Sequence, residues 1–249
     1  EAYHRDLERL AAGELRAQVG EGEPASIHDQ VRMKEEGLEK QLYFDPCAKA
    51  CFQDHFLSPQ AGPVDFAEGR LSADWATARY TLDRADETPA GMGLAMSRTG
   101  QAAGARVSLT KELTLLDNGR LQASYLVECQ GERPLAAVFG VAFNLMLYSD
   151  TDPNRHLLFD GRRKAEVVEA GLEQAGRIEL VNVSDGVRLS FVLPDQTQVW
   201  HHPVYTVSMS EDGFERTYQG TGLMLLFPLS LAPGEGRRVT FEMPVGAVS

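Results

Sequence analysis

Apolar and polar residues alternate with a period of two along most of the chain from residue 64 onward. In two neighbouring segments the apolar positions are Val107, Leu109, Leu113 and Leu115, followed by Leu121, Ala123, Tyr125 and Val127. Between these segments stands Asp117-Asn118-Gly119. This tripeptide predicts a tight hairpin turn of type I′, which requires positive φ at both central residues.

A second pair of alternating segments, 178–183 and 187–193, is joined through Ser184-Asp185-Gly186, and a last strand at 239–243 follows the turn-forming 232–236. The apolar run 135–148 is interrupted by Gly and Asn and is predicted as a buried strand or strand pair, since it is too short to span a membrane. Strands with one polar and one apolar face, without helices between them, form antiparallel sheets. We therefore predict a mainly β chain, folded as one large antiparallel β-sandwich.

The first residues follow a different period. Apolar residues recur on one face of a helix at Tyr3, Leu7, Leu10 and Ala11, and Gly13 is a plausible stop. Glu21-Gly22-Glu23-Pro24 then predicts a hinge. A short N-terminal helix is therefore expected ahead of the sandwich.

Two stretches carry long, unusual motifs. The first holds KEEGLEKxLxFD over Lys34–Asp45 and the DHFL box over Asp54–Leu57, and the second holds VSxSEDGFERxYQG over Val207–Gly220. These motifs resemble the C-terminal region of glycoside hydrolase family 57 enzymes, the 4-α-glucanotransferases and related α-amylases. The resemblance implies a galactose-mutarotase-like super-sandwich, which alternation alone does not name.

The resemblance also implies where the chemistry lies. Members of this family carry their catalytic nucleophile and acid in an N-terminal barrel, and nothing resembling that barrel is present in this sequence. Residues 1–25 would then be the tail of the catalytic half plus a linker, and residues 26–249 the β-sandwich. The expected partners are that barrel and an α-glucan or maltooligosaccharide, and no catalytic residue is assigned to this chain. The reaction of the whole enzyme would be a double displacement with retention.

Charge and cysteine content exclude some classes of function. The formal net charge is −12, which argues against nucleic acid as a partner because such sites need clustered cations. The basic cluster Gly161-Arg162-Arg163-Lys164 is short and is read as a solvated turn. No signal segment opens the sequence and no apolar run predicts a membrane partner. Three cysteines, Cys47, Cys51 and Cys129, leave one unpaired, which favours the reducing cytoplasm.

Candidate sugar-binding residues crowd into the second motif region. A sugar site joins a flat aromatic ring to polar groups that orient hydroxyls. The candidates are Trp200, His202, Tyr205, Glu211 and Tyr218. Aromatic residues in a β protein are also common as core anchors, and strand alternation would send about half of them inward.

Three alternatives stay open. Cys47, Cys51 and His55 are spaced to share one face of a helix as zinc ligands, and Asp150, Asp152 and Asp160 are turn formers that a hard cation could use. Neither set has a complete ligand pattern, so no metal or cofactor is expected. The chain could instead be an independent carbohydrate-binding module. It could also be an aldose 1-epimerase-like enzyme using His201 or His202 with Glu211 for proton transfer.

Overall fold

The computed structural model describes residues 45–89, 91–146, 152–164, 169–210 and 213–248. Before residue 45 it describes Arg5, Glu8, Arg9, Ala12 and residues 16–19, 30–34 and 37–38. The expected boundary between residues 25 and 26 falls outside the described residues and stays a prediction. In the expected N-terminal helix, Arg5, Glu8 and Arg9 have helical backbone, and the Ala12 amide donates to the Glu8 carbonyl at 2.9 Å.

The described chain is built almost entirely of strands, as predicted. These are β1 (Arg16–Val19), β2 (Gln30–Met33), β3 (Gln53–Leu57), β4 (Thr81–Thr88), β5 (Gly91–Ala102), β6 (Ala105–Leu116), β7 (Leu121–Cys129), β8 (Leu135–Leu145), β9 (Arg155–Phe159), β10 (Arg162–Lys164), β11 (Gly171–Asn182), β12 (Val187–Ser210), β13 (Gly213–Leu231), β14 (Gly236–Met243) and β15 (Val245–Ala247). One short helix, α2 (Pro63–Ala67), lies between β3 and β4. Among the described residues no helix is long and apolar enough to cross a membrane.

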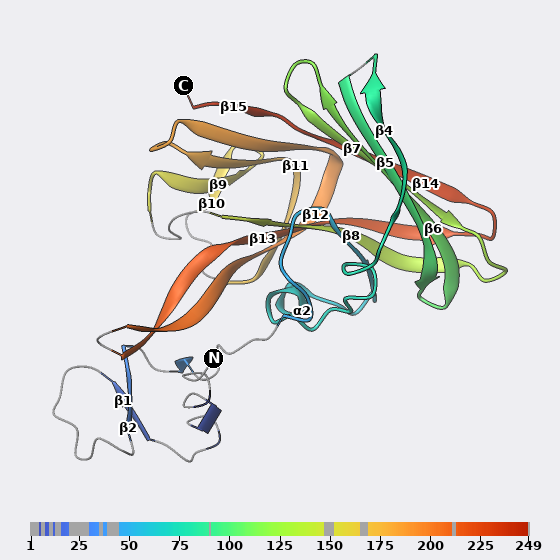
Figure 1. Cartoon of the computed structure of the whole chain (residues 1–249). Helices are drawn as coiled ribbons and strands as arrows, with labels where there is room; N and C mark the ends of the chain where they lie inside the picture. Colours follow the sequence, from blue (N-terminus) through green and yellow to red (C-terminus); the bar gives the residue numbers. More distant parts are fainter. Residues whose placement is uncertain are drawn as a thin grey trace.

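The strands form two packed layers (Figure 1). Layer A contains β3, β8, β13 and the second half of β12. Layer B contains β4, β5, β6, β7 and β14 and continues through the first half of β12 into β11, β9 and β10. Apart from pairs that involve β1 and β2, all these ladders are antiparallel. The two layers are one continuous sheet because the 24-residue β12 passes from layer B into layer A.

The main core lies between the layers and is rich in aromatic side chains. Tyr125 of layer B contacts Phe139 of layer A with ring centroids 5.4 Å apart, and Phe143 of layer A meets Phe241 of layer B at 6.0 Å. These residues sit at the alternating inward positions of their strands, so period-two patterning placed them correctly. Cys129 is also buried, at the end of β7.

A second, smaller cluster covers the outer face of layer A. The segment between β3 and β4 crosses this face, and Phe66 of α2 packs with Trp200, Met224 and Leu226. Helix α2 begins after Gly62, whose amide donates to Asp65 Oδ2 at 2.9 Å and so satisfies a free amide at the helix start. The same segment then places Trp75 in the main core.

The predicted hairpins are present, but one turn differs from its expected type. Residues 117–119 connect β6 and β7, and Gly119 has φ of 76°, whereas Asn118 does not have positive φ. The Gly119 amide donates to the Leu116 carbonyl, and the Leu116 amide to the Arg120 carbonyl. The prediction of type I′ is therefore wrong: this is a three-residue loop in which one left-handed residue suffices. The β11–β12 hairpin and strand β14 lie where they were predicted.

The β12–β13 hairpin extends beyond the sandwich body toward the N-terminal strands (Figure 1). Near its tip Phe214 pairs with Met33 of β2, and the Lys34 amide donates to the Phe214 carbonyl at 2.9 Å. Lys34 Nζ also lies 2.6 Å from Glu215 Oε2. Two of the motifs found in the sequence, those at 34–45 and 207–220, therefore meet at this point.

Candidate functional site

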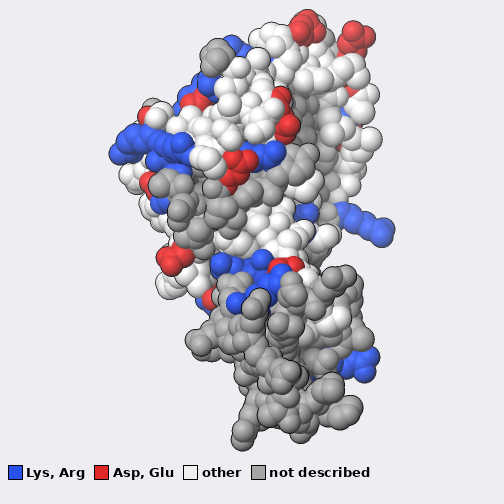
Figure 2. Space-filling view, turned by 90° about the vertical axis from the view of Figure 1, so that its left-hand side faces the viewer, with Lys and Arg blue, Asp and Glu red and all other residues white. Residues whose placement is uncertain are grey.

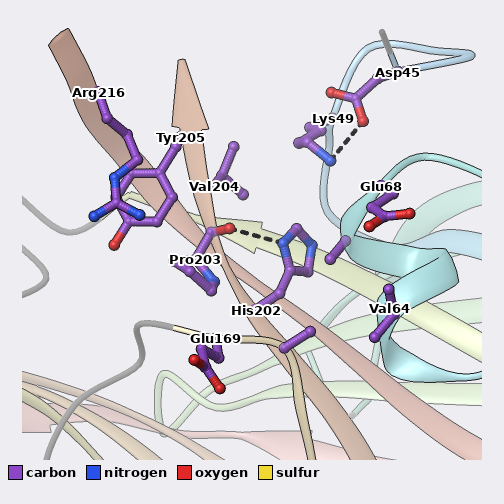
Figure 3. Close-up of a pocket in the computed structure, with 12 residues that line it drawn as sticks. Asp45, Lys49, Val64, Glu68, Glu169, His202, Pro203, Val204, Tyr205 and Arg216 are labelled. Atoms are coloured by element: carbon purple, nitrogen blue, oxygen red, sulfur yellow. Dashed lines mark hydrogen bonds and ion pairs between the residues drawn. The ribbon is translucent and has the colours of Figure 1, made fainter. Parts of the chain in front are cut away.

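A pocket of about 450 Å³ lies where the β12–β13 hairpin leaves the sandwich, beside helix α2 (Figure 3). Its lining comes from four separate parts of the chain: the loop before β3, α2, the residues before β11, and the hairpin. The lining residues are Asp45, Lys49, Val64, Ala67, Glu68, Glu169, Ala170, His202, Pro203, Val204, Tyr205 and Arg216. Three of the five predicted sugar-binding residues, His202, Tyr205 and Tyr218, lie in this region.

His202 forms the inner wall of the pocket and is 1% exposed. Its Nδ1 lies 2.9 Å from the Pro203 carbonyl oxygen. Because a carbonyl only accepts, Nδ1 carries the proton, and Nε2 is left without a hydrogen-bond partner among the described residues. Burial, with a smaller contribution from nearby Lys49, lowers the pKa of His202 to about 4. The imidazole is therefore neutral at pH 7.

A register shift in the β12–β13 ladder positions the aromatic residue of the pocket. Between Val204 and Tyr205 the pairing moves by one residue, so Tyr205 lies opposite Tyr218. The two rings meet edge to face at 5.8 Å, and the Arg216 guanidinium lies over the Tyr205 ring at 4.3 Å. Such a contact holds the phenol ring in a fixed orientation at the pocket edge.

Charged side chains from the loop before β3, the end of α2 and the residues before β11 line the rest of the pocket. Lys49 Nζ pairs with Asp45 Oδ1 at 2.8 Å, while Glu68 at the end of α2 pairs with Arg70. Glu169 approaches from the residues before β11 (Figure 3). Carboxylate and ammonium groups beside an aromatic ring supply acceptors, donors and a flat apolar surface, which together suit a neutral polyhydroxyl ligand.

One of the predicted sugar-binding residues, Trp200, lies elsewhere. Trp200 is buried against Phe66 and Met224 on the outer face of layer A, so its ring offers no surface platform. This correction has a plain cause: α2 and its flanking loop cover the strand face on which Trp200 lies. Glu211 lies outside the described residues.

His201 and His202 face opposite sides of β12, as strand alternation requires. His202 contacts Phe66 over the outer face, with centroids 4.6 Å apart, whereas His201 lies 5.8 Å from Phe159 on the inner side. Burial lowers the pKa of His201 to about 4 as well. Both imidazoles are enclosed, so neither is presented to a sugar ring in solvent. No observation favours the epimerase interpretation.

The alternative in which Cys47, Cys51 and His55 share one face of a helix does not hold. Residues 45–52 form bends and irregular backbone, and His55 belongs to strand β3. Cys51 donates weakly to the Asn144 carbonyl at 3.5 Å, and all three cysteines are free thiols. Among the described residues no three His, Cys, Asp or Glu side chains come together as a possible metal site.

The aspartates of the β9 region behave as turn formers. Asp152 Oδ1 accepts the Asn154 amide at 2.8 Å, and Asp160, with φ of 49°, accepts the amides of Gly176 and Arg177. These backbone contacts account for their presence without a cation. Asp150 lies outside the described residues.

The family model for the C-terminal domain of α-amylase/4-α-glucanotransferase matches residues 1–241 of this chain. The chain belongs to this family. The α-amylase 1 of Dictyoglomus thermophilum is 27% identical over 246 residues, which cover 97% of this chain and 34% of that protein. The 4-α-glucanotransferase of Thermococcus kodakarensis is 27% identical over 214 residues, covering 84% of this chain and 28% of that protein. The chain thus spans about a third of the length of these relatives.

Solved structures confirm the fold of this family member. The 4-α-glucanotransferase from Thermococcus litoralis superposes with a TM-score of 0.64 at 22% identity, over 86% of this chain and 30% of that one. A GalM/aldose epimerase homologue from C. elegans superposes with a TM-score of 0.52 at 10% identity, over 70% of each chain. The galactose-mutarotase-like sandwich predicted from the motifs is therefore confirmed.

Sequence analysis missed several pocket residues. Lys49, Glu68 and Glu169 carry no local signal, because each lies in an unremarkable polar stretch and gains its place only when α2, β11 and β12 pack together. Arg216 lies within the VSxSEDGFERxYQG motif but is not one of the candidates named from the sequence. The signals that pointed to this end of the molecule were the VSxSEDGFERxYQG motif and the Lys34–Asp45 motif, whose last residue lines the pocket.

Proposed function

We propose that this chain is the non-catalytic C-terminal β-sandwich of an enzyme acting on α-1,4-glucans, and that the pocket at the base of the β12–β13 hairpin borders or binds the glucan. Family membership supports the general assignment. The observation that carries the finer one is the juxtaposition of the fixed Tyr205 ring with carboxylates from three other segments in one pocket of about 450 Å³. That volume suits one or two sugar rings.

The catalytic barrel of the same polypeptide is the proposed partner. The hairpin tip, joined to β2 through Phe214 and Lys34, lies on the route by which the chain would arrive from that barrel. The sandwich would stabilise the barrel and complete the rim of its cleft, and both catalytic carboxylates would come from the barrel. Purified as it stands, the chain is then expected to leave maltotriose intact, and turnover of maltotriose would contradict this proposal.

Glucan binding is tested by calorimetry with maltoheptaose. Tyr205→Ala should weaken binding about tenfold, because stacking of a sugar on an aromatic ring contributes roughly 1–2 kcal/mol. Met209→Ala, an exposed position near the hairpin tip and outside the pocket, is the control and should bind as the parent does. Heat of binding measured with the unmodified chain, in the absence of a catalytic barrel, would mean that the domain is also an independent carbohydrate-binding module. No heat at millimolar maltoheptaose would leave the pocket as rim or interface only.

The three free thiols support a reducing compartment, and we propose the cytoplasm. Two of them, Cys47 and Cys51, lie in the same loop near the protein surface, where an oxidising environment would act on them. Assaying thiols in protein purified anaerobically from its native cells checks this: finding them oxidised would oppose the assignment.

A further inference from the structure

Three arginines distant in sequence gather on the outer face of β9, β10, β11 and β12. In the strand register, Arg163 of β10 lies opposite Leu158 of β9, and Leu158 lies opposite Glu179 of β11. Arg188 of β12 lies opposite Val181 of β11. Paired residues of neighbouring strands share a face, and residues two apart along a strand share one too. Arg177 therefore lies on the same face as Glu179 and Val181. The alternate residues of these strands, among them Leu157, Ile178 and Phe191, are in the core.

Two of the arginines, Arg177 and Arg188, share one carboxylate. Glu179 Oε1 lies 3.3 Å from Arg177 Nη2 and 3.7 Å from Arg188 Nε. Arg177 also donates to Ser190 Oγ at 3.0 Å, and Arg163 donates to the Pro153 carbonyl at 2.9 Å. The Glu179 side chain is 11% exposed, whereas those of Arg177 and Arg188 are 44% and 35% exposed. The carboxylate thus lies beneath guanidinium groups that reach solvent.

His156 of β9 is on the same face. It lies opposite Val181 of β11, which in turn lies opposite Arg188 of β12. Partial burial lowers the pKa of its imidazole, and Arg163 and Arg188 both oppose its protonation. The positive charges of these two arginines therefore act on the imidazole of His156. At the rim, the Asp160 carboxylate is held by the amides of Gly176 and Arg177 and by Gln196. Figure 2, which views this side of the molecule, shows Lys and Arg side chains gathering on it.

We propose that Arg163, Arg177 and Arg188, around His156, form a binding site for a phosphate monoester dianion. Each guanidinium has five N–H donors in a planar fork, and the contacts described above use few of them. A phosphate offers three strong acceptor oxygens to such forks and binds them bidentately. The ligand also relieves the mutual repulsion of the three cations, which one buried carboxylate does not neutralise.

The proposed ligand is a single phosphate group, either inorganic phosphate or the phosphate of a sugar phosphate. A long polyanion is disfavoured because the protein as a whole carries −12 and would repel it beyond the patch. The site is separate from the pocket beside α2, so it does not depend on the proposed glucan site.

The test is calorimetric titration of the whole chain at low ionic strength with inorganic phosphate, glucose 6-phosphate and glucose. Arg177→Gln/Arg188→Gln removes two of the cations and should weaken phosphate binding by at least about tenfold. The control variant Arg120→Gln/Arg238→Gln makes the same change in net charge outside the proposed site. The Arg120 side chain is 53% exposed and pairs with Glu242, and the Arg238 side chain is 52% exposed and pairs with Glu112. This control should bind within about twofold of the parent. Arg163→Gln alone, at an exposed position, is the second variant and should weaken binding about threefold.

Glucose should give no heat at this site. Tighter binding of glucose 6-phosphate than of inorganic phosphate would identify a sugar phosphate as the ligand, and equal or weaker binding would identify free phosphate. The proposal is overturned if neither anion binds at millimolar concentration. It is equally overturned if the Arg120/Arg238 control loses as much affinity as the site variant, since binding would then follow overall charge alone.

Discussion

His202 and Gly222 lie directly opposite each other in the β12–β13 ladder, and the imidazole occupies the space that a side chain at position 222 would need. A Cβ on Gly222 would come within 2.3 Å of His202 Nε2. His201 has the same relationship to Gly171 of β11, at 2.6 Å. Two adjacent histidines are therefore enclosed on opposite faces of β12. His202 packs over a glycine of β13, and His201 packs over a glycine of β11.

Gly222→Ala should destabilise the protein by roughly 1–3 kcal/mol, because the added methyl group forces the His202 ring out of a packed position. Urea denaturation measures this as a lower midpoint with an unchanged slope. Gly246→Ala in β15, where no atom lies within 4 Å of the new Cβ, is the matched control and should cost well under 1 kcal/mol. Equal losses in the two variants would mean that the ring does not define the space at position 222.

Stability should fall as pH decreases from about 6.5 toward 4. In the unfolded chain His201 and His202 titrate near 6.5, whereas burial lowers their pKa to about 4 in the folded protein. Between these values the unfolded state binds more protons, so acid favours unfolding. Each histidine should cost about 2 kcal/mol between pH 7 and pH 5.

The variant His202→Gln should remove one histidine's share of this pH dependence. Denaturation of the parent and the variant at both pH values gives the comparison. Since His55 is also buried with its pKa lowered to about 4, a pH slope should remain in the variant. An unchanged difference between pH 7 and pH 5 would show that His202 is not buried in its neutral form.

Asp54 and Lys111 form an ion pair of 2.6 Å inside the sandwich, with side chains 1% and 6% exposed. Tyr80 donates to the same carboxylate oxygen, and Lys111 also donates to the Phe52 carbonyl. Asp54→Ala should therefore destabilise the protein by about 3–5 kcal/mol, because it leaves a buried ammonium without its counter-charge.

The double variant Asp54→Leu/Lys111→Met should recover much of that loss, since it removes both charges while keeping apolar volume. Tyr80→Phe should cost only about 1 kcal/mol, the typical value of one hydrogen bond. Free energies of unfolding for the four proteins form the necessary comparison. A double variant no more stable than Asp54→Ala would contradict a buried pair.

Trp75, from the segment between β3 and β4, is buried in the main core between the two layers. Its Nε1 donates to the Gln101 carbonyl at 2.9 Å, Arg98 lies 4.5 Å over its ring, and Gly100 leaves room for it. Trp75→Ala should cost about 3–5 kcal/mol. Arg98→Ala should cost about 1 kcal/mol, since it removes the cation and leaves the buried ring. Thermal unfolding followed by circular dichroism ranks the two, and a reversed order would mean that the ring is not a core element.

The sequence alone determined the secondary structure and the family. Period-two alternation and turn-forming tripeptides are local properties, so β6, β7, β11, β14 and their turns could be located from them. The VSxSEDGFERxYQG motif identified the family, which then implied the sandwich. Local patterns also produced an error: Asn118 does not have the positive φ expected of a type I′ turn.

Tertiary structure decided which residues meet. Trp200 is buried because α2 folds over it, and Lys49 and Glu169 reach one pocket from distant segments. Arg163, Arg177 and Arg188 align because the four strands β9, β10, β11 and β12 pair in register. None of these contacts is encoded by neighbours in sequence. They depend on how the 24-residue strand β12 passes from one layer to the other. Burial of apolar surface favours this arrangement, and that burial is shared among segments distant in sequence rather than arising within any one of them.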